Sequence, residues 1–342
     1  MRLHSLQYLR AIAAIAVVYS HSVLQVESYA KELHYAGGFG VNIFFVISGF
    51  IMVFISKPDA TPSSFLVNRI RRVVPLYWFF TIMMAVILAF LPSLFKTTQF
   101  AWDTVFMSLA FIPHYSEAHS GYVWPILAPG WSLNYEMYFY LLFAASLFFT
   151  YRFQALITCT LITTLFVLAR LTHSDNAAIV FMSDAVVFEF IFGMLLALLW
   201  KQGLRIHSFV AVILIIVGFA VLIFREQWFP TTTAHVLKIG IPSLLVVTGF
   251  LYIKLPHWKF FVLLGDASYA LYLSHIFTLG PIRKWLPPLL GDNPAAPYLF
   301  VAIAMTICII VSLFVHWFID NWLLRHERLD ALAGKQSQPS QP

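Results

Sequence analysis

The sequence predicts an all-α integral membrane protein, a bundle of about ten transmembrane helices with a short re-entrant segment. Of its 342 residues, 61% are hydrophobic and 11% are charged, whereas an ordinary soluble domain carries about 25% charged residues. A soluble cytosolic enzyme is therefore excluded, because so few polar side chains cannot cover a globular surface. The formal charge of +6 comes from basic residues in short segments between apolar runs, which indicates membrane orientation rather than nucleic-acid binding.

Ten apolar segments, bounded by Gly, Pro and charged residues, are the expected helices. They lie near residues 5–26, 40–56, 73–92, 132–150, 153–171, 178–200, 207–224, 236–254, 260–279 and 297–321. Residues 102–113 are apolar but fall short of the roughly 20 residues that cross a bilayer, so we expect a re-entrant or surface-lying segment there. Residues 1–325 form one transmembrane domain, and residues 326–342 form a polar, disordered cytoplasmic tail with too little apolar surface to build a core.

The basic residues orient the expected spans. With both termini in the cytoplasm, thirteen Lys and Arg residues face the cytoplasm and seven face outward, as the positive-inside rule favours. Arg10 interrupts the first apolar run where the core of a signal peptide should be uncharged. We therefore expect the first helix to be retained rather than cleaved after Ala30.

Ionisable residues inside the expected spans are the candidate functional groups, because they are costly in a bilayer unless paired or hydrated. Arg10 and His21 are eleven residues apart, which places them on one helix face about 16 Å apart along the axis. Between them, Ala14 and Val17 are small enough to leave a slot beside the helix. The alternative is an arginine that reaches the inner surface and a histidine satisfied by its neighbours.

Two further elements combine charge with helical spacing. Arg69 and Arg72 lie side by side at i,i+3, and their planar guanidinium groups match phosphate oxygens; a simple positive-inside anchor is the alternative. Glu136 lies about one turn inside the fourth span, on the face that carries Ser132. The first pair is expected near the cytoplasmic side and Glu136 in the outer half of the membrane.

The ninth and sixth spans add polar stripes. Ser268, Tyr272 and His275 fall on one face of the ninth span, with His275 in the outer half. Asp184 and Glu189 are about 140° apart on a helical wheel, so they cannot both face one narrow site. The depths of these groups suggest that an anionic ligand enters from the cytoplasm and presents its reactive end to an acceptor outside.

Six motifs in this order resemble the acyltransferase-3 family of multipass membrane acyltransferases, which modify exported glycans and other acceptors. The matching elements are Arg10 with His21, the 40–50 segment GVNIFFVISGF, Arg69-x-x-Arg72 with Pro75, Trp131-Ser132-Leu133 with Glu136, Phe139 and Tyr140, Glu189-Phe190 with Gly193, and Ser268-Tyr269 with Tyr272, Leu273 and His275. The resemblance covers about residues 5 to 325. Asp320 stands where the family usually has a glutamate in the final helix.

The resemblance implies an acetyl-CoA-dependent O-acetyltransferase that uses no metal. Arg69 and Arg72, with help from Arg10, would hold the CoA phosphates. His21 would act as general base on the acceptor hydroxyl, because imidazole titrates near neutral pH. Glu136 would orient His21, and His275 would bind the oxyanion or the acceptor; covalent transfer through His21 remains the alternative. The implied substrate-binding residues are Asn42, Ser48, Trp131, Ser132 and Tyr272.

The expected acceptor is a glycan hydroxyl at the outer side of a bacterial inner membrane, in an exopolysaccharide or lipopolysaccharide precursor. Outer-loop aromatic residues such as Tyr122 and Trp124 suit sugar stacking, and an interfacial aromatic belt is the alternative. The protein would contact membrane lipid and no nucleic acid, and the sequence leaves its oligomeric state open. A transporter or flippase is the rival class, but many transporters have repeated halves and no internal repeat is visible.

Overall fold

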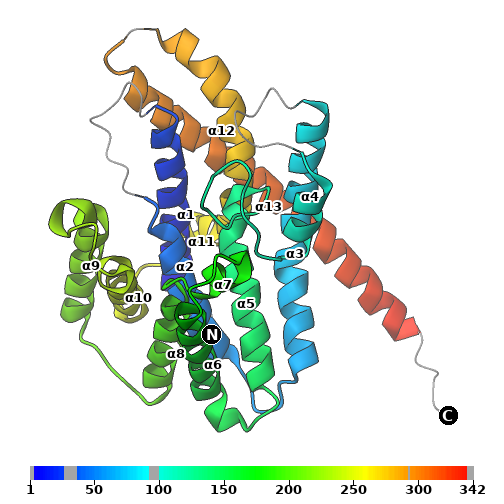
Figure 1. Ribbon diagram of the computed structural model, residues 1–342, viewed down its shortest axis with the longest axis vertical. Helices are drawn as coiled ribbons and strands as arrows, with labels where there is room; N and C mark the ends of the chain where they lie inside the picture. The colour runs from blue at the N-terminus through cyan, green and yellow to red at the C-terminus, as the bar shows by residue number, and fades with distance from the viewer. Residues whose placement is uncertain (1–3, 27–36, 92–99, 292, 337–342) are drawn as a thin grey trace.

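The computed structural model describes residues 4–26, 37–91, 100–291 and 293–336, with side chains described up to residue 319. Within these residues all regular structure is helical (Figure 1). The α-helices are α1 (His4–Leu24), α2 (Gly40–Ile55), α3 (Pro62–Phe90), α4 (Trp102–Leu109), α5 (Trp131–Ser146), α6 (Gln154–Leu171), α7 (Ala177–Met182), α8 (Val187–Lys201), α9 (Ser208–Trp228), α10 (Ile241–Tyr252), α11 (Lys259–Asp266), α12 (Ser268–Leu290) and α13 (Ala296–Gln336). Short 3-10 turns η2 (Ala128–Gly130) and η3 (Tyr151–Phe153) precede α5 and α6, and a π-helical turn η4 (Val236–Gly240) precedes α10.

The expected all-α class is confirmed, but the count of ten crossings is not. In the described part of the chain, five helical segments are long and apolar enough to cross a membrane, and a sixth is added if the bent pair α11 and α12 is one span. The expected short segment at 102–113 contains the eight-residue helix α4. The region around Ala30 and the last six residues of the tail lie outside the described residues, as does the side chain of Asp320.

Helix α3 begins earlier than the sequence predicted, at Pro62 rather than near residue 73. Thr61 caps it: its side chain accepts a hydrogen bond from the backbone N–H of Ser64 at 3.2 Å, and Ser64 bonds back to Thr61. Proline is favoured at the first helical position because no hydrogen bond is needed there. Arg69 and Arg72 are therefore held on a regular 29-residue helix rather than in a loop.

Two of the expected spans are broken. The sixth is divided between α7 and α8 by a turn in which the Asp184 carboxylate accepts a hydrogen bond from the Val186 N–H at 3.0 Å. The ninth bends by 67° between α11 and α12. This bend begins α12 at Ser268, next to the cavity described below.

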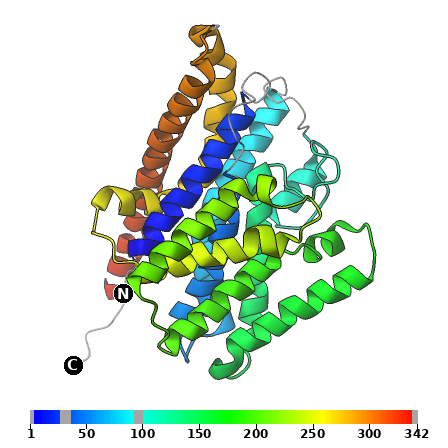
Figure 2. The ribbon, with the colours of Figure 1, turned by 90° about the vertical axis from the view of Figure 1, so that its left-hand side faces the viewer.

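The centre of the bundle is formed by α1, α2, α8 and α12, with α3 and α5 beside them (Figures 1 and 2). Helices α2 and α8 pack unusually closely because glycines face backbone at their contact. A Cβ atom on Gly49 would collide with the Phe190 carbonyl, and one on Gly193 would collide with the Val46 carbonyl. This contact holds α2, which lines the cavity along much of its length, in a set position.

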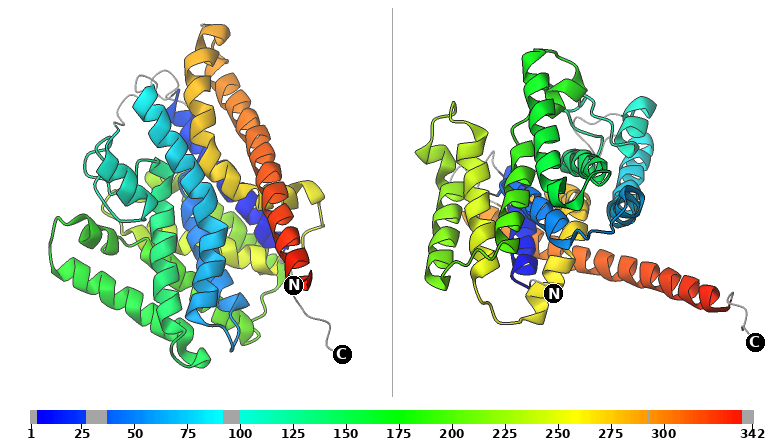
Figure 3. Two further views of the ribbon diagram at one scale, coloured as in Figure 1. Left: turned by 90° about the vertical axis from the view of Figure 1, so that its right-hand side faces the viewer. Right: turned by 90° about the horizontal axis from the view of Figure 1, so that it is seen from below.

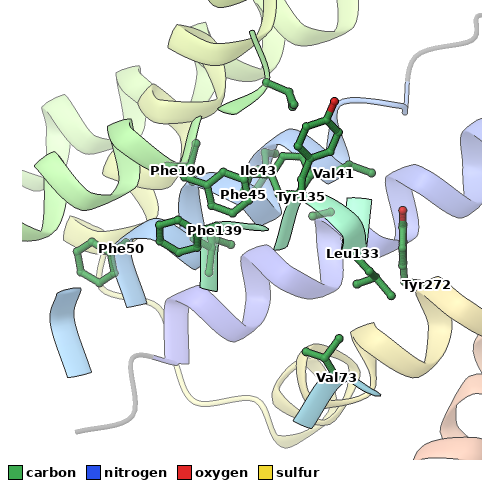
Figure 4. Packing of buried hydrophobic residues seen from close by; sticks show 14 of the residues in the cluster. Val41, Ile43, Phe45, Phe50, Val73, Leu133, Tyr135, Phe139, Phe190 and Tyr272 are labelled. Carbon is green, nitrogen blue, oxygen red and sulfur yellow. The ribbon is translucent and has the colours of Figure 1, made fainter. Parts of the chain in front are cut away.

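Aromatic rings fill the core between α2, α5 and α8. The ring of Phe190 lies 4.7 Å from that of Phe45 and 4.5 Å from that of Phe139, measured between centroids (Figure 4). A second apolar cluster joins α1 and α12 to α13, where Phe300 and Cys308 are fully buried. Helices α12 and α13 form a pair that extends beyond the rest of the bundle at one end, and the far end of α13 projects away from it (Figure 3).

Candidate active site

A cavity of about 110 Å³ lies among α1, α2, α3, α5 and the start of α12. Its polar lining combines arginine, glutamate, serine and tyrosine side chains, whereas its apolar lining comes mainly from α2. The polar members are Arg10, Ser48, Arg69, Arg72, Ser132, Glu136, Tyr140, Ser268, Tyr269 and Tyr272. Seven residues of α2 between Val41 and Met52 line it, over a length of about 16 Å along the helix. Figure 4 shows Leu133 and Tyr272, two of the lining residues, among the buried side chains of the bundle.

Three arginines converge on the cavity without a carboxylate partner. Arg10 donates a hydrogen bond to the amide oxygen of Gln7 at 3.1 Å, and the guanidinium of Arg69 lies 5.9 Å from the centre of the Phe65 ring. Among the described side chains, none of Arg10, Arg69 and Arg72 forms an ion pair. Three guanidinium groups share the cavity with one carboxylate, that of Glu136. The excess of positive charge suits an anion with several oxygens, such as a phosphate or pyrophosphate.

Glu136 belongs to this cavity and not to the histidines. Its carboxylate accepts hydrogen bonds from the Ser48 hydroxyl at 2.9 Å and from the Tyr140 hydroxyl. Within the described part of the chain it has no hydrogen bond to His21 or His275, so the expectation that it orients His21 is not supported by the geometry. Glu136 lies one helical turn beyond Ser132, on the side of α5 that leads to the arginines.

His21 and His275 form a direct pair. His21 Nδ1 and His275 Nε2 are 2.7 Å apart, and the two rings are nearly parallel with centroids 4.8 Å apart. His275 Nδ1 donates to the Leu271 carbonyl at 3.3 Å, so Nε2 of a neutral His275 carries the lone pair. His21 Nδ1 must then be the donor, which leaves the lone pair of His21 on Nε2. The His21 ring is thus held by His275, and its Nε2 is free to accept a hydrogen bond or a proton.

Tyr272 lies between the cavity and the histidine pair. It lines the cavity, and its ring centre is 6.2 Å from that of His275. Its hydroxyl donates to the Pro129 carbonyl at 2.8 Å and contacts the Ser132 hydroxyl at 2.8 Å. These bonds anchor Tyr272 to the start of α5, so the wall between the cavity and the histidines is hydrogen-bonded rather than merely packed.

The slot expected beside Ala14 and Val17 is filled in the structure. Their exposed fractions are 0% and 2%, and each belongs to an apolar cluster. Gly40 of α2 packs against Val17, so closely that a Cβ atom there would lie 2.9 Å from a Val17 methyl group. Small side chains let neighbouring helices approach instead of leaving a channel, so Tyr272 is the cavity residue whose ring contacts His275.

Two predicted substrate-binding residues lie away from the cavity. The Asn42 amide donates to the Glu189 carboxylate at 2.8 Å, and Glu189 also contacts His235 Nε2 at 2.9 Å. Trp131 is half-buried, with its ring edge-on to those of Phe45 and Tyr135. The remaining predicted donor and substrate residues, Arg10, Ser48, Arg69, Arg72, Ser132 and Tyr272, do line the cavity.

Residue-based reasoning missed the local roles of Tyr140, Tyr269 and His235. Tyr140 follows Glu136 at i,i+4, a spacing that places both on one face and therefore signalled the contact. Tyr269 lines the cavity and donates to the Val73 carbonyl at 2.7 Å. Nothing in the sequence indicated that His235, 46 positions from Glu189 along the chain, would be the partner of that carboxylate.

Comparison with known proteins finds a matching family and similar sequences. Residues 3–315 match the model of the acyltransferase-3 family, described as an acyltransferase domain. The exopolysaccharide production protein ExoZ of Rhizobium meliloti is 36% identical over 256 residues, which cover 72% of this chain and 78% of ExoZ. The O-acetyltransferase OatA of Staphylococcus aureus is 28% identical over 308 residues, which cover 80% of this chain and 50% of OatA. No solved structure matches the chain.

Proposed function

This chain belongs to the acyltransferase-3 family of membrane acyltransferases, and from that premise we propose that it transfers an acetyl group from acetyl-CoA to a hydroxyl of an exported glycan. The observation that carries the proposal is the single cavity that joins three unpaired arginines to the wall beside the His21–His275 pair. A transporter needs no such combination of an anion site with a general base. The acceptor class is suggested by the relatives named for exopolysaccharide production and O-acetylation.

The donor would bind with its phosphates at the arginine end. Arg69 and Arg72 lie in the first half of the 29-residue helix α3, which begins at Pro62 and at about 1.5 Å per residue is some 43 Å long. We place this end of α3 on the cytoplasmic side, because the basic residues of the neighbouring connections are concentrated there. The thioester would then extend along α2 toward Tyr272, with Ser48 and Glu136 beside it.

His21 would act as general base and remove the proton of the acceptor hydroxyl through Nε2. The oxygen attacks the thioester carbonyl, a C–O bond forms, the C–S bond breaks, and the CoA thiolate leaves and takes up a proton. His275 would hold the His21 ring and continue to accept its Nδ1–H after Nε2 is protonated. Tyr272 must move for the thioester and the acceptor to meet, because it stands between the cavity and His275.

The donor site is tested by the affinity of the purified protein in nanodiscs for acetyl-CoA. Arg69→Ala and Arg72→Ala should each weaken binding roughly 10- to 100-fold, the range for losing a charge-assisted hydrogen bond. Lysine replacements should restore little, because an ammonium cannot reproduce the planar fork. Arg71→Ala is the matched control, since Arg71 lies between them, is exposed and does not line the cavity.

Wild-type affinity in the Arg69→Ala, Arg72→Ala double variant would contradict the donor site. The reaction is tested separately by mass spectrometry of the glycans of cells with and without the gene, where loss of acetyl groups is expected. Sidedness is tested with single cysteines at the exposed positions Arg205 and Ser120 in a chain lacking Cys159 and Cys308. These cysteines should react from opposite sides of the membrane.

A further inference from the structure

The connection from α4 to η2 (residues 110–127) carries a second hollow, separate from the arginine cavity. It is small and lined by both hydroxyl and aromatic side chains on the loop and on α4. The lining residues are Thr104, Ser116, Glu117, Ala118, His119, Trp124, Pro125, Ile126 and Ala128. None of these residues lines the cavity that holds the arginines.

Trp124 and His119 line the hollow, and Tyr122 packs on Trp124 beside it. The ring centre of Trp124 lies 4.5 Å from that of Tyr122 and 5.1 Å from that of His119. Tyr122 is 54% exposed, and Trp124 is half-buried. The two rings therefore pack against each other, and the Tyr122 ring remains more than half exposed. An exposed aromatic ring is matched by the C–H face of a sugar ring.

The loop is held in shape by its own backbone. The Ser116 N–H donates to the Tyr122 carbonyl at 2.8 Å, and the Tyr122 N–H donates to the His119 carbonyl at 3.1 Å. Gly121, at φ 84°, takes the left-handed conformation that this tight turn requires. Tyr115 ties the loop to the segment before α7 by donating to the Asp175 carbonyl at 2.8 Å. A preorganised platform loses little entropy when a ligand binds.

The polar lining selects the kind of ligand. Ser116 and Thr104 supply hydroxyl groups, and the exposed carboxylate of Glu117 accepts hydrogen bonds without an ion-pair partner among the described residues. Carboxylate and hydroxyl oxygens bind sugar hydroxyls, whereas the negative charge of Glu117 disfavours an anionic ligand. The chemistry therefore fits a neutral, hydroxyl-rich saccharide rather than a uronate or a phosphorylated sugar.

The hollow adjoins the wall beside the histidine pair. Its last lining residue, Ala128, is followed by Pro129, whose carbonyl accepts hydrogen bonds from the Tyr272 hydroxyl and the Ser132 hydroxyl. The chain therefore passes directly from the edge of the hollow at Ala128 into the hydrogen bonds that hold Tyr272. This position fits a sugar unit next to the one that reacts.

We propose that the Tyr122–Trp124 platform with Glu117 is a subsite for a neutral saccharide unit of the acceptor, adjacent to the unit that is acylated. This inference rests on the proposed function, whose acceptor class it narrows. It requires an acceptor of more than one sugar, so that one unit occupies the loop while a hydroxyl of its neighbour reaches His21. Glu117 would contribute selectivity against acidic sugars.

The test uses the full chain in nanodiscs and cellotetraose as the neutral probe, with tetragalacturonate as the acidic probe. Saturation-transfer NMR should detect cellotetraose, and Trp124→Ala should weaken its binding by about tenfold or more, as expected for loss of an aromatic anchor. Glu117→Gln should reduce the difference in affinity between cellotetraose and tetragalacturonate. Trp102→Ala is the matched control, because Trp102 is 77% exposed on α4 but lies outside the hollow.

The outcomes separate the subsite from the proposed reaction. If Trp124→Ala and Trp102→Ala reduce cellotetraose binding equally, or if neither does, the aromatic residues form a membrane-interface belt and the subsite is overturned. A thermal unfolding midpoint equal to wild type excludes a folding defect as the cause. Acetyl-CoA affinity should be unchanged in every loop variant; absence of any acetyl transfer by the wild type would instead contradict the proposed function, while leaving the saccharide-binding result standing.

Discussion

Glu136 and Glu189 both lie in the first two turns of a helix, and the carboxylate of each accepts a hydrogen bond from a side chain of α2. The two residues differ in their other contacts and in their surroundings. Glu136 bonds to Ser48 and Tyr140 and lines the arginine cavity. Glu189 is 1% exposed and bonds to Asn42 and His235. Their partners on α2 are six residues apart, so the two carboxylates approach α2 from different sides. An acidic residue in a membrane helix can therefore belong to a functional site or hold two helices together. Its hydrogen-bond partners distinguish the two cases.

The largest expected effect concerns a residue in neither carboxylate cluster. His21→Ala and His21→Asn should both reduce turnover roughly 10²- to 10⁴-fold, the usual contribution of general acid–base catalysis, because neither replacement can take a proton near neutral pH. Acetyl-CoA affinity should persist, since Arg10 lies about 16 Å away along α1. Steady-state kinetics and equilibrium binding measure the two effects. Near-normal turnover in His21→Asn would transfer the role of base to Glu136.

The second prediction separates the two glutamates by activity. Glu136→Gln should reduce transfer about tenfold. The neutral amide bonds more weakly to Ser48 and Tyr140, and the lost stabilisation is about that of one hydrogen bond to a charged group. Glu189→Gln keeps the shape of its side chain and lies outside the cavity, so transfer should change less than about twofold. Turnover at saturating donor is the measurement. Equal losses of transfer activity in the two variants would show that Glu136 and Glu189 do not differ in their contribution to the reaction.

The third prediction separates them by stability. Glu189→Ala should lower the free energy of unfolding by about 1–3 kcal/mol, the cost of leaving a buried polar partner unsatisfied, here the Asn42 amide. Asn42→Ala should have a similar effect, and the double variant should lose less than the sum because the two residues share one interaction. Denaturant unfolding in mild detergent measures all three. Strict additivity would show that the Asn42–Glu189 bond contributes nothing.

The smallest expected effect is a pH dependence of stability that arises from the contact between His235 and Glu189. Burial of His235 disfavours its charged form, but the hydrogen bond and charge of Glu189 outweigh burial and raise the pKa of His235 above its usual value. Its stabilising contribution is therefore complete below about pH 6.5 and is lost as the pH rises through the raised pKa. The unfolding midpoint should fall over that range.

His235→Gln should remove this dependence on pH. The matched control is His173→Asn, which changes an exposed histidine whose positive φ of 47° suits asparagine. An unchanged pH profile in His235→Gln would show that the pair with Glu189 does not titrate in the measured range.

The sequence by itself determined the all-α membrane class and the family, but not the bounds of every helix. Low charge and long apolar runs require a lipid-facing helical protein, because backbone groups in a bilayer must be satisfied within their own segment. Helical spacing also placed Arg69 beside Arg72, and Ser268, Tyr272 and His275 on one stripe, since such neighbours depend on local geometry alone.

Only the tertiary structure decided which of these local groups meet. His21 and His275 are 254 positions apart and pair because α1 and α12 run side by side. Glu136 lines the same cavity as the arginines. Asn42 does not line it and contacts Glu189 and His235 instead. Side-chain spacing on one helix cannot specify the rotation of a neighbouring helix, which is set here by glycine contacts such as Gly49 against Phe190 and by apolar packing across the bundle.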